Sequence, residues 1–420
     1  MSLSAAQKHD LPKLTQAEAD QICAKHDRLW TSKPGGARAV FAWKNLQGLN
    51  LRGRNLCDAD FTGAILADCL MQHTRLDHAN LFGVDLQHAN LTEASMRRAD
   101  LRGACLRGAN LTGVDLFEAD LREGAIATAD RERGLRVLEP INRGAGDIQG
   151  TILAGANLER SKLSGVMAVR ADFTDAVLKD AKLIRANLKQ ANMKGAMLAG
   201  ADLSGADLAG ADLRDAVLVG CKTLSWNITD ANMAGVLTDE PSGKAVDDLP
   251  YKTMIRDHAR WCETGGVEGK PSSFDNADLR ALETIRGFNL TALSAKGAVF
   301  YGLDMEGVQL QGAHLEGADL RGCNLRRADL RGARLVNAKL SGADLRDAAM
   351  GPLLIGGERL LACNLTGATL KNADLARADV RQAIFTDADL SRANFTGAMT
   401  KQANLTGAVR QNVRGLADAI

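Results

Sequence analysis

The chain has 420 residues, enough for two or more domains, and its 52 Lys and Arg residues balance its 51 Asp and Glu residues to a formal charge of +1 at pH 7. This balance argues against a partner held by charge alone, and aromatic residues, at 4%, offer little for base stacking, so we expect no direct nucleic-acid binding. No run of eighteen apolar residues occurs and no apolar segment follows Met1, so we expect a cytoplasmic protein without a membrane span.

The N-terminal 40 residues read as a tail followed by a helix. Residues 1–14 are polar and are expected to be a flexible tail, and residues 15–40 a capping helix and turn. Thr15, with an acidic residue three positions later, forms the capping-box pattern that opens a helix. His26 and Trp30 fall on one face of this helix, which is expected to cover the open end of the segment that follows.

From residue 41 the chain repeats every five residues, most clearly in AMLAGADLSGADLAGADLRDA over residues 196–216. Each unit reads Ala, Asp or Asn, Leu and two variable positions, so the apolar spacing alternates between two and three, which suits neither a helix nor a plain strand. The pattern predicts a corner every five residues with Ala and Leu inside, four sides to a coil, and coils stacked about 4.8 Å apart. The expected core includes the central leucines Leu198, Leu203, Leu208, Leu213, Leu320, Leu325 and Leu330.

With this A(D/N)LXX signature the chain resembles the pentapeptide-repeat proteins. The resemblance implies an all-β solenoid, a right-handed quadrilateral β-helix, here with short α-helical caps. It implies little about activity, because most members of the family have no assigned function. One branch resembles DNA in shape and charge and binds gyrase, protecting it from quinolones.

The first β-helix is expected over residues 41–238, interrupted at 127–147. The five-residue phase is lost there, because Ile148 follows the central residue Ile126 by 22 positions, which is not a multiple of five. The excursion is either a tolerated loop or a binding loop. Its candidate partner-binding residues, in a stretch where basic and acidic residues alternate, are Arg131, Arg133, Arg136, Glu139 and Arg143.

Residues 239–273 are expected to be a linker with a second capping helix. His258 and Trp261 lie at helical spacing and are followed by glycines, a Phe and a Leu, the order already seen after the first helix, so the capping module is duplicated. Neither His26 nor His258 has a second ligand at fixed spacing, so both are interpreted as helix residues that pack on a coil.

A second β-helix is expected over residues 274–408, with one slip of phase between Leu279 and Ile285. Four residues in its later part, Gly351, Pro352, Gly356 and Gly357, predict a kinked or bulged side across which the phase survives. Residues 409–420 carry apolar residues at spacings of four, three and four, and a short amphipathic helix is expected to close this end.

The sequence offers no set of residues for catalysis, a metal or a cofactor, and we expect none of the three. Four cysteines stand where Ala normally does, which indicates small core residues: Cys69, Cys221, Cys323 and Cys363. Columns of acids and amides twenty apart, such as Asp60, Asn80, Asp100 and Asp120, are interpreted as structural ladders. We therefore expect a non-enzymatic scaffold for a protein partner of unknown identity. The alternative, a DNA-mimicking modulator of gyrase or topoisomerase, is not favoured, because only the first run of repeats leans acidic.

Overall fold

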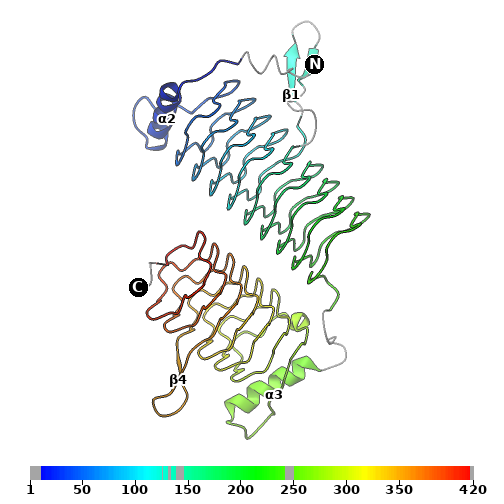
Figure 1. Ribbon diagram of the computed structural model, residues 1–420, viewed down its shortest axis with the longest axis vertical. Helices are drawn as coiled ribbons and strands as arrows, with labels where there is room; N and C mark the ends of the chain where they lie inside the picture. Colours follow the sequence, from blue (N-terminus) through cyan, green and yellow to red (C-terminus); the bar gives the residue numbers. More distant parts are fainter. Residues whose placement is uncertain (1–10, 125, 131–133, 139–145, 242–249, 417–420) are drawn as a thin grey trace. The chain divides into compact units, whose positions relative to one another are not determined.

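The computed structural model describes residues 11–124, 126–130, 134–138, 146–241 and 250–416. The chain divides into two compact units, Met1–Asp239 and Glu240–Ile420, and each is described by itself. Both consist of stacked coils preceded by one helix (Figure 1). None of the helices in the described residues is both long and apolar enough to cross a lipid bilayer.

Each coil takes twenty residues, and each of its four sides pairs with the coil above and below. Asn45, for example, bridges Ile65 in parallel, and Ile65 bridges Asp85 in turn. The amide of a central residue donates to the next coil, as Leu46 N does to Ile65 O at 2.8 Å. A turn closes each side, as where Leu49 N donates to Leu46 O at 3.0 Å. The five-residue period therefore arises from one short strand contact and one turn per side.

The interior of each unit is a column of Leu and Ala side chains. Leu and Ala residues of both units that point inward are buried, and the two units have separate apolar cores. The seven leucines named above, Leu198, Leu203, Leu208, Leu213, Leu320, Leu325 and Leu330, have fully buried side chains. Larger residues also fit, since Phe41 and Phe61 of successive coils stack with ring centroids 4.9 Å apart.

Helix α2 (Gln16–Trp30) lies against the first coil of the first unit. The capping box predicted at Thr15 is present, and the buried residues Ala19 and Cys23 belong to the core of this unit. The Gln16 side chain donates to Asn50 O at 2.9 Å and accepts from Asn50 N at 2.8 Å, so it completes the backbone pairing of the first coil.

The tail differs from expectation in its described part. Lys13 bridges Asn45 in parallel, and Leu14 N donates to Asn45 O at 2.9 Å. Residues 11–14 are thus an extra short strand on the first coil, because the edge of that coil offers unpaired backbone groups. The preceding residues, 1–10, lie outside the described part.

Helix α3 (Tyr251–Glu263) lies against the first coil of the second unit. Tyr251, Ile255 and Ala259 are buried in its core, and the Tyr251 ring lies 5.9 Å from that of Phe274. The predicted slip of phase follows in the short 3-10 helix η2 (Arg280–Leu282). Bridges there join residues 21 apart before returning to 20, so η2 adds one residue to its side of the coil.

The interruption expected at 127–147 already includes Ile126, ends before Asp147 and does not divide the first unit. Ile126 is not a central residue of a coil, because it lies in strand β1 (Ile126–Asp130), which pairs antiparallel with β2 (Gly134–Leu138). The coils continue across the excursion through the bridge of Cys105 with Asp147. Ile148 is buried and takes the central position that Ile126 was expected to hold.

The kinked side predicted near Gly351 is a hairpin of two strands, β3 (Leu353–Leu354) and β4 (Leu360–Leu361), which projects from the coils (Figure 1). Bridges across it join residues thirty apart, as Arg334 with Asn364, instead of twenty. The insertion is ten residues long, which equals two five-residue repeats. The phase therefore survives although these ten residues leave the coil.

The prediction of a helix over residues 409–420 is wrong for residues 409–416, which the structure describes. Val409 bridges Asp389 and Arg414 bridges Asn394, so the coil continues to residue 414. Backbone pairing with the preceding coil satisfies more hydrogen bonds than one isolated helical turn would, which accounts for the difference. Residues 417–420 lie outside the described part.

Candidate protein-contact site

The buried imidazole of His26 ties the segment after α2 back to the helix. Its Nδ1 accepts from Ala39 N at 3.0 Å, which places the ring hydrogen on Nε2. Trp30 Nε1 lies 3.1 Å from that Nε2, which carries the ring hydrogen in this tautomer and cannot accept, so Trp30 contacts His26 edge to face with ring centroids 6.3 Å apart. Burial lowers the pKa of His26, which keeps the ring neutral.

His258 has the same role in the second unit. Its Nδ1 accepts from Ser272 N at 3.1 Å, and Nε2 lies 3.2 Å from Thr291 O, to which it donates in this tautomer. The Trp261 ring packs beside it, with centroids 5.8 Å apart. Gly269 makes the return possible, because a Cβ there would lie 2.1 Å from Asp257 O. These histidines and tryptophans are therefore packing residues, and the described residues contain no group of three or more potential metal ligands.

The cysteines at Ala positions are small interior residues that also donate. The thiols of Cys69, Cys221 and Cys323 each lie 3.0 Å from the carbonyl oxygen of a central residue in the preceding coil. Thr74 makes the same contact with Leu51 O at 2.9 Å. All eight cysteines are free, and burial raises the pKa of the Cys69 thiol to about 12, so this thiol is not a nucleophile at neutral pH.

The candidate residues of the first excursion fall mostly outside the described part. Arg131, Arg133, Glu139 and Arg143 lie there, and Arg136 lies in β2, where its backbone pairs with that of Thr128. For this excursion the structure thus describes the antiparallel backbone pairing of β1 with β2.

Eight aspartates of the acidic columns pair with an arginine two residues further along the chain. In each pair the guanidinium folds back on the carboxylate, as where Arg331 Nη2 lies 2.6 Å from Asp329 Oδ2. The pairs are Asp100–Arg102, Asp120–Arg122, Asp212–Arg214, Asp278–Arg280, Asp319–Arg321, Asp329–Arg331, Asp344–Arg346 and Asp379–Arg381. The sequence reading of these columns missed the pairing, although the recurring DLR triplet was the signal for it.

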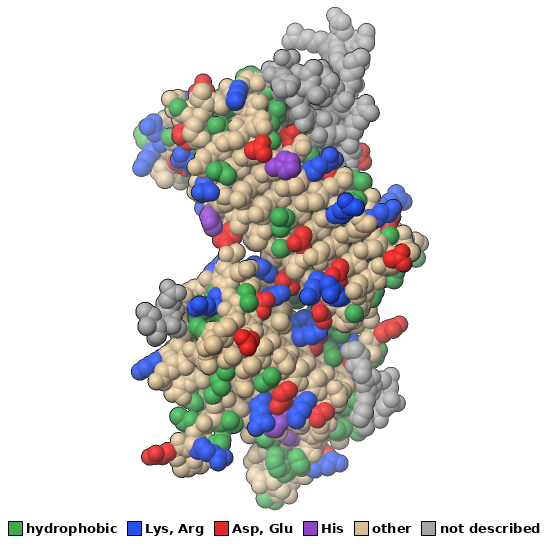
Figure 2. Space-filling view, viewed as in Figure 1, with side chains coloured by type: hydrophobic (Ala, Val, Ile, Leu, Met, Phe, Trp, Pro, Cys, Tyr) green, Lys and Arg blue, Asp and Glu red, His purple; other side chains and the backbone are tan. Residues whose placement is uncertain are grey.

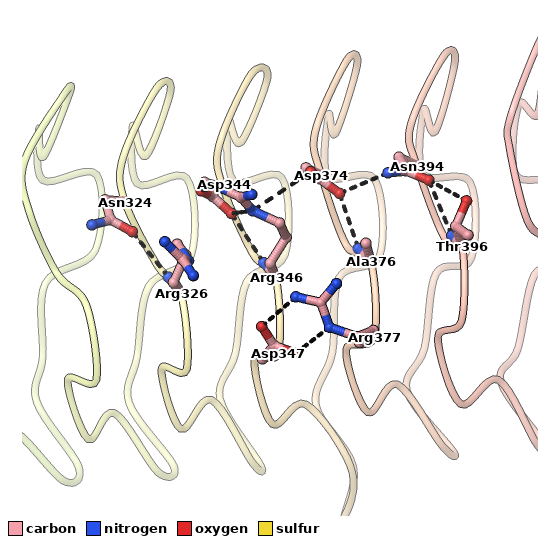
Figure 3. A network of polar contacts seen from close by, with 10 residues as sticks. All are labelled: Asn324, Arg326, Asp344, Arg346, Asp347, Asp374, Ala376, Arg377, Asn394 and Thr396. Carbon is pink, nitrogen blue, oxygen red and sulfur yellow. Dashed lines mark hydrogen bonds and ion pairs between the residues drawn. The ribbon is translucent and has the colours of Figure 1, made fainter.

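One such column continues across the projecting hairpin (Figure 3). Arg346 pairs with Asp344 and lies 3.6 Å from Asp374 in the next coil, whose Oδ1 accepts from Asn394 Nδ2 at 2.9 Å. Beside it, Arg377 donates twice to Asp347 at 2.7 Å, and these bonds lower the pKa of the Asp347 carboxyl. On the face seen in Figure 2, basic and acidic side chains are interspersed and form no continuous acidic strip.

The hairpin β3–β4 is the most exposed apolar element of the second unit. Leu353 pairs with Leu361 and Leu354 with Leu360, so the two pairs point to opposite faces. Leu354, Ile355 and Leu360 are 60%, 40% and 52% exposed. Contiguous exposed apolar surface often marks an interaction site, which makes this hairpin the candidate contact.

The other face of the hairpin is fixed to the coils at Gly332. A Cβ at Gly332 would lie 3.0 Å from Leu353 Cβ and 3.1 Å from Leu361 Cδ2, so any larger residue would push the hairpin away from the coils. The hairpin is therefore held at its root while its second apolar pair faces solvent.

Among the cavities of the described residues, one lies at the hairpin root and one beside α2, and both are lined by charged side chains. One of about 260 Å³ lies at the hairpin root, lined by Arg331, Gly351, Pro352, Asp379, Arg381 and Gln382. The other, of about 430 Å³, lies between α2 and the first coil, where Arg54 pairs with Asp20 at 2.7 Å. At the hairpin root Asp379 holds Arg381, and in the other cavity Arg52 donates to the Gln72 amide oxygen at 2.8 Å. We therefore do not assign a ligand to either cavity.

The bridges every twenty residues define a repeat solenoid whose coils have four five-residue sides. The model of the pentapeptide-repeat family matches in eight copies, over residues 45–81, 79–116, 147–180, 176–215, 309–347 and 363–407. These stretches make up more than half of the chain, which therefore belongs to the pentapeptide-repeat family. The matches stop before the hairpin β3–β4 and resume after it.

Solved structures similar to the chain include several pentapeptide-repeat proteins. HetL from the cyanobacterium Nostoc, involved in heterocyst differentiation regulation, is 23% identical over 91% of this chain and 93% of its own, with a TM-score of 0.18. Rfr23 from Cyanothece is 29% identical over 32% of this chain and 88% of its own, with a TM-score of 0.24. QnrB1, a plasmid-mediated fluoroquinolone resistance protein, is 18% identical over 48% of this chain and 86% of its own, with a TM-score of 0.24.

With TM-scores this low, the likenesses carry no argument about what this chain binds. No curated protein matches the chain. Function therefore has to be argued from the chain's own surface.

Proposed function

We propose that the protein is a non-enzymatic scaffold that holds a protein partner, with the hairpin β3–β4 as its main contact. The observation that carries the proposal is the exposure of Leu354, Ile355 and Leu360 on an element fixed at its root. Exposed aliphatic side chains gain most from burial against a partner, and a hairpin that is already ordered loses little conformational entropy on binding.

The rest of the fold serves, in this proposal, to hold such contacts at fixed distances. We infer a right-handed quadrilateral β-helix in each unit, with α2 and α3 acting as caps because each buries apolar residues on a first coil. We further propose that the protein works in the cytoplasm. The hairpin β1–β2, with Arg131, Arg133, Arg136, Glu139 and Arg143 in or near it, is a second proposed contact element.

Gyrase binding by DNA mimicry is supported less well. A mimic needs a long surface of one negative sign. Here Asp–Arg pairs interrupt the acidic charge of the first unit at Asp100–Arg102, Asp120–Arg122 and Asp212–Arg214.

The test is partner capture with surface variants of the full chain. L354D/L360D places two charges on the exposed face of the hairpin and leaves the packed pair Leu353 and Leu361 unchanged. We expect at least one protein captured from a lysate of the source cells by the wild type to be lost by more than tenfold with this variant.

V267D/M399D is the matched control, because it adds the same charges at two other exposed apolar positions, 85% and 47% exposed. It should retain the captured protein. A chain in which residues 127–147 are replaced by a short Gly/Ser turn tests the second element. Equal capture by the wild type and L354D/L360D would remove the hairpin from the proposal.

A further inference from the structure

The later coils of the first unit distribute their charge unevenly among their four faces. Residues twenty apart share a face, and bridges run from Lys162 to Lys182, from Lys182 to Asp202 and from Asp202 to Lys222. We call the outward side formed by residues 162–165, 182–185, 202–205 and 222–225 the lysine face.

The lysine face is the basic side of these coils. It carries four basic residues, Lys162, Lys182, Arg185 and Lys222, and a single acidic one, Asp202. On each of the other three faces of the same coils, acidic residues equal or outnumber basic ones. The near-zero charge of the whole chain conceals this asymmetry.

The basic groups of this face are available to a partner. All four are exposed, and in the described residues the only ion pair of this group within 4 Å joins Lys162 to Asp120, at 3.7 Å. Lys182 and Lys222 flank Asp202 in the neighbouring coils and interact with it electrostatically. Asp202 is 8% exposed and accepts from Ser204 N at 3.2 Å. Asp202 therefore offsets part of the charge of Lys182 and Lys222, but four basic residues against one acid leave the face basic.

Two aliphatic side chains stand in the same face. Ile184 is 36% and Leu224 is 77% exposed. The equivalent positions of the alternate coils carry Ser164 and Ser204, so the repeat does not require an aliphatic residue there. Lysines and exposed aliphatic residues thus share one flat, rigid surface about 14 Å long, three coil spacings.

We propose that the lysine face docks on the headgroup layer of an anionic lipid bilayer. Such a layer offers, in one plane, phosphates for Lys162, Lys182, Arg185 and Lys222 and an apolar boundary for Ile184 and Leu224. A nucleic acid would meet the charges but leave Leu224 without an apolar partner, and this face has no aromatic ring for bases. The proposal does not depend on the hairpin β3–β4, which belongs to the other unit.

The test is sedimentation of the full-length protein with lipid vesicles. In 0.1 M salt we expect binding to vesicles of 70% phosphatidylcholine and 30% phosphatidylglycerol, none to phosphatidylcholine alone, and loss of binding in 0.5 M salt. K182D/K222D should lower the partition coefficient at least about tenfold, because two attractive charges become repulsive. I184S/L224S should lower it severalfold at unchanged charge.

Ser already occupies the aliphatic positions of the alternate coils at Ser164 and Ser204, and Asp occupies successive coils of this column at Asp100 and Asp120. The unfolding temperature of every variant is measured, and K182S/K222S, which removes the two charges without adding acids, should lower binding in the same direction. R170D/K194D makes the same charge change on other faces and should bind within about twofold of wild type.

The proposal is overturned if the protein fails to bind anionic vesicles, or if R170D/K194D loses binding as far as K182D/K222D does. It is also overturned if duplex DNA or polyglutamate, but not the vesicles, binds in a manner that depends on Lys182 and Lys222. None of these variants changes the hairpin β3–β4, so a failure of the lipid proposal can be distinguished from a failure of the scaffold proposal.

Discussion

The imidazole of His258 makes the second unit sensitive to acid. Burial lowers its pKa below the usual 6.5, and Nδ1 must stay unprotonated to accept from Ser272 N. Above about pH 6.5 both the folded and the unfolded state are neutral at this ring. Below it the unfolded state takes up a proton that the folded state refuses, so stability falls as the pH drops.

We therefore expect the free energy of unfolding of wild type to fall by about 1–2 kcal/mol more than that of H258Q between pH 7 and pH 5. Gln can occupy the same site without titrating. Carboxylates such as Asp347, whose pKa is lowered by Arg377, lose their contribution at lower pH and do not interfere. Urea unfolding at the two pH values measures this, and equal losses in both proteins would contradict the role of His258.

For single residues, the sequence predicted the inward-facing positions, because every repeat places them in the same surroundings. The inward leucines and the Ala-like cysteines followed from the five-residue period alone, since the coil leaves room for a small residue at that position. The Asp–Arg pairs could not be predicted in this way. The five-residue period indicates on which face a side chain lies, but not whether it bends back to contact a residue of its own coil.

Among the elements, the hairpin β3–β4 depends on a glycine of another coil. Gly332 has φ +68° and contacts Leu353 and Leu361, whereas Gly317 has φ +67° and nothing within 4 Å of a Cβ. Asn adopts this backbone conformation elsewhere in the chain, at Asn337 and Asn372, so it is tolerable at both glycines.

G332N should displace the hairpin from the coils, and G317N should not. We expect amide hydrogen exchange in residues 353–361 to rise at least tenfold in G332N, because the leucine pair loses its packing surface, while exchange in the neighbouring coils stays unchanged. Protection of the hairpin in G332N equal to that in G317N would show that its root does not need Gly332.

The two hairpins also show why one excursion was evident in the sequence as a loss of phase and the other only as a kinked or bulged side. The first adds 22 residues, which is not a multiple of five, so the loss of phase can be seen in the sequence. The second adds ten, two repeats, so Ile355 and Leu360 fall where central residues would and only the glycines hint at a departure. A period detects insertions only when they are not multiples of it. For the same reason the apolar contact site was missed and the first excursion was favoured.

For the whole molecule, two separate apolar cores predict two independently folding units. The core of the first unit shares no residue with that of the second, and each unit has its own helix on its first coil. The stability of a solenoid comes from contacts between neighbouring coils, so each unit should keep the free energy of folding that its own coils supply. We expect residues 240–420, expressed alone, to fold and to protect the amides of Leu310 to Leu330 as in the full chain.

A second fragment, residues 266–420, tests what α3 adds. It lacks Tyr251, Ile255 and Ala259, whose burial we expect to contribute about 4 kcal/mol, and it exposes the first coil as an unpaired edge. We expect it to unfold at lower urea concentration than residues 240–420, with the greatest loss of protection near Phe274 and Leu279. If both fragments unfold alike, α3 does not stabilise the coil; if neither folds while the full chain does, the units are not independent and the stack must be treated as one cooperative body.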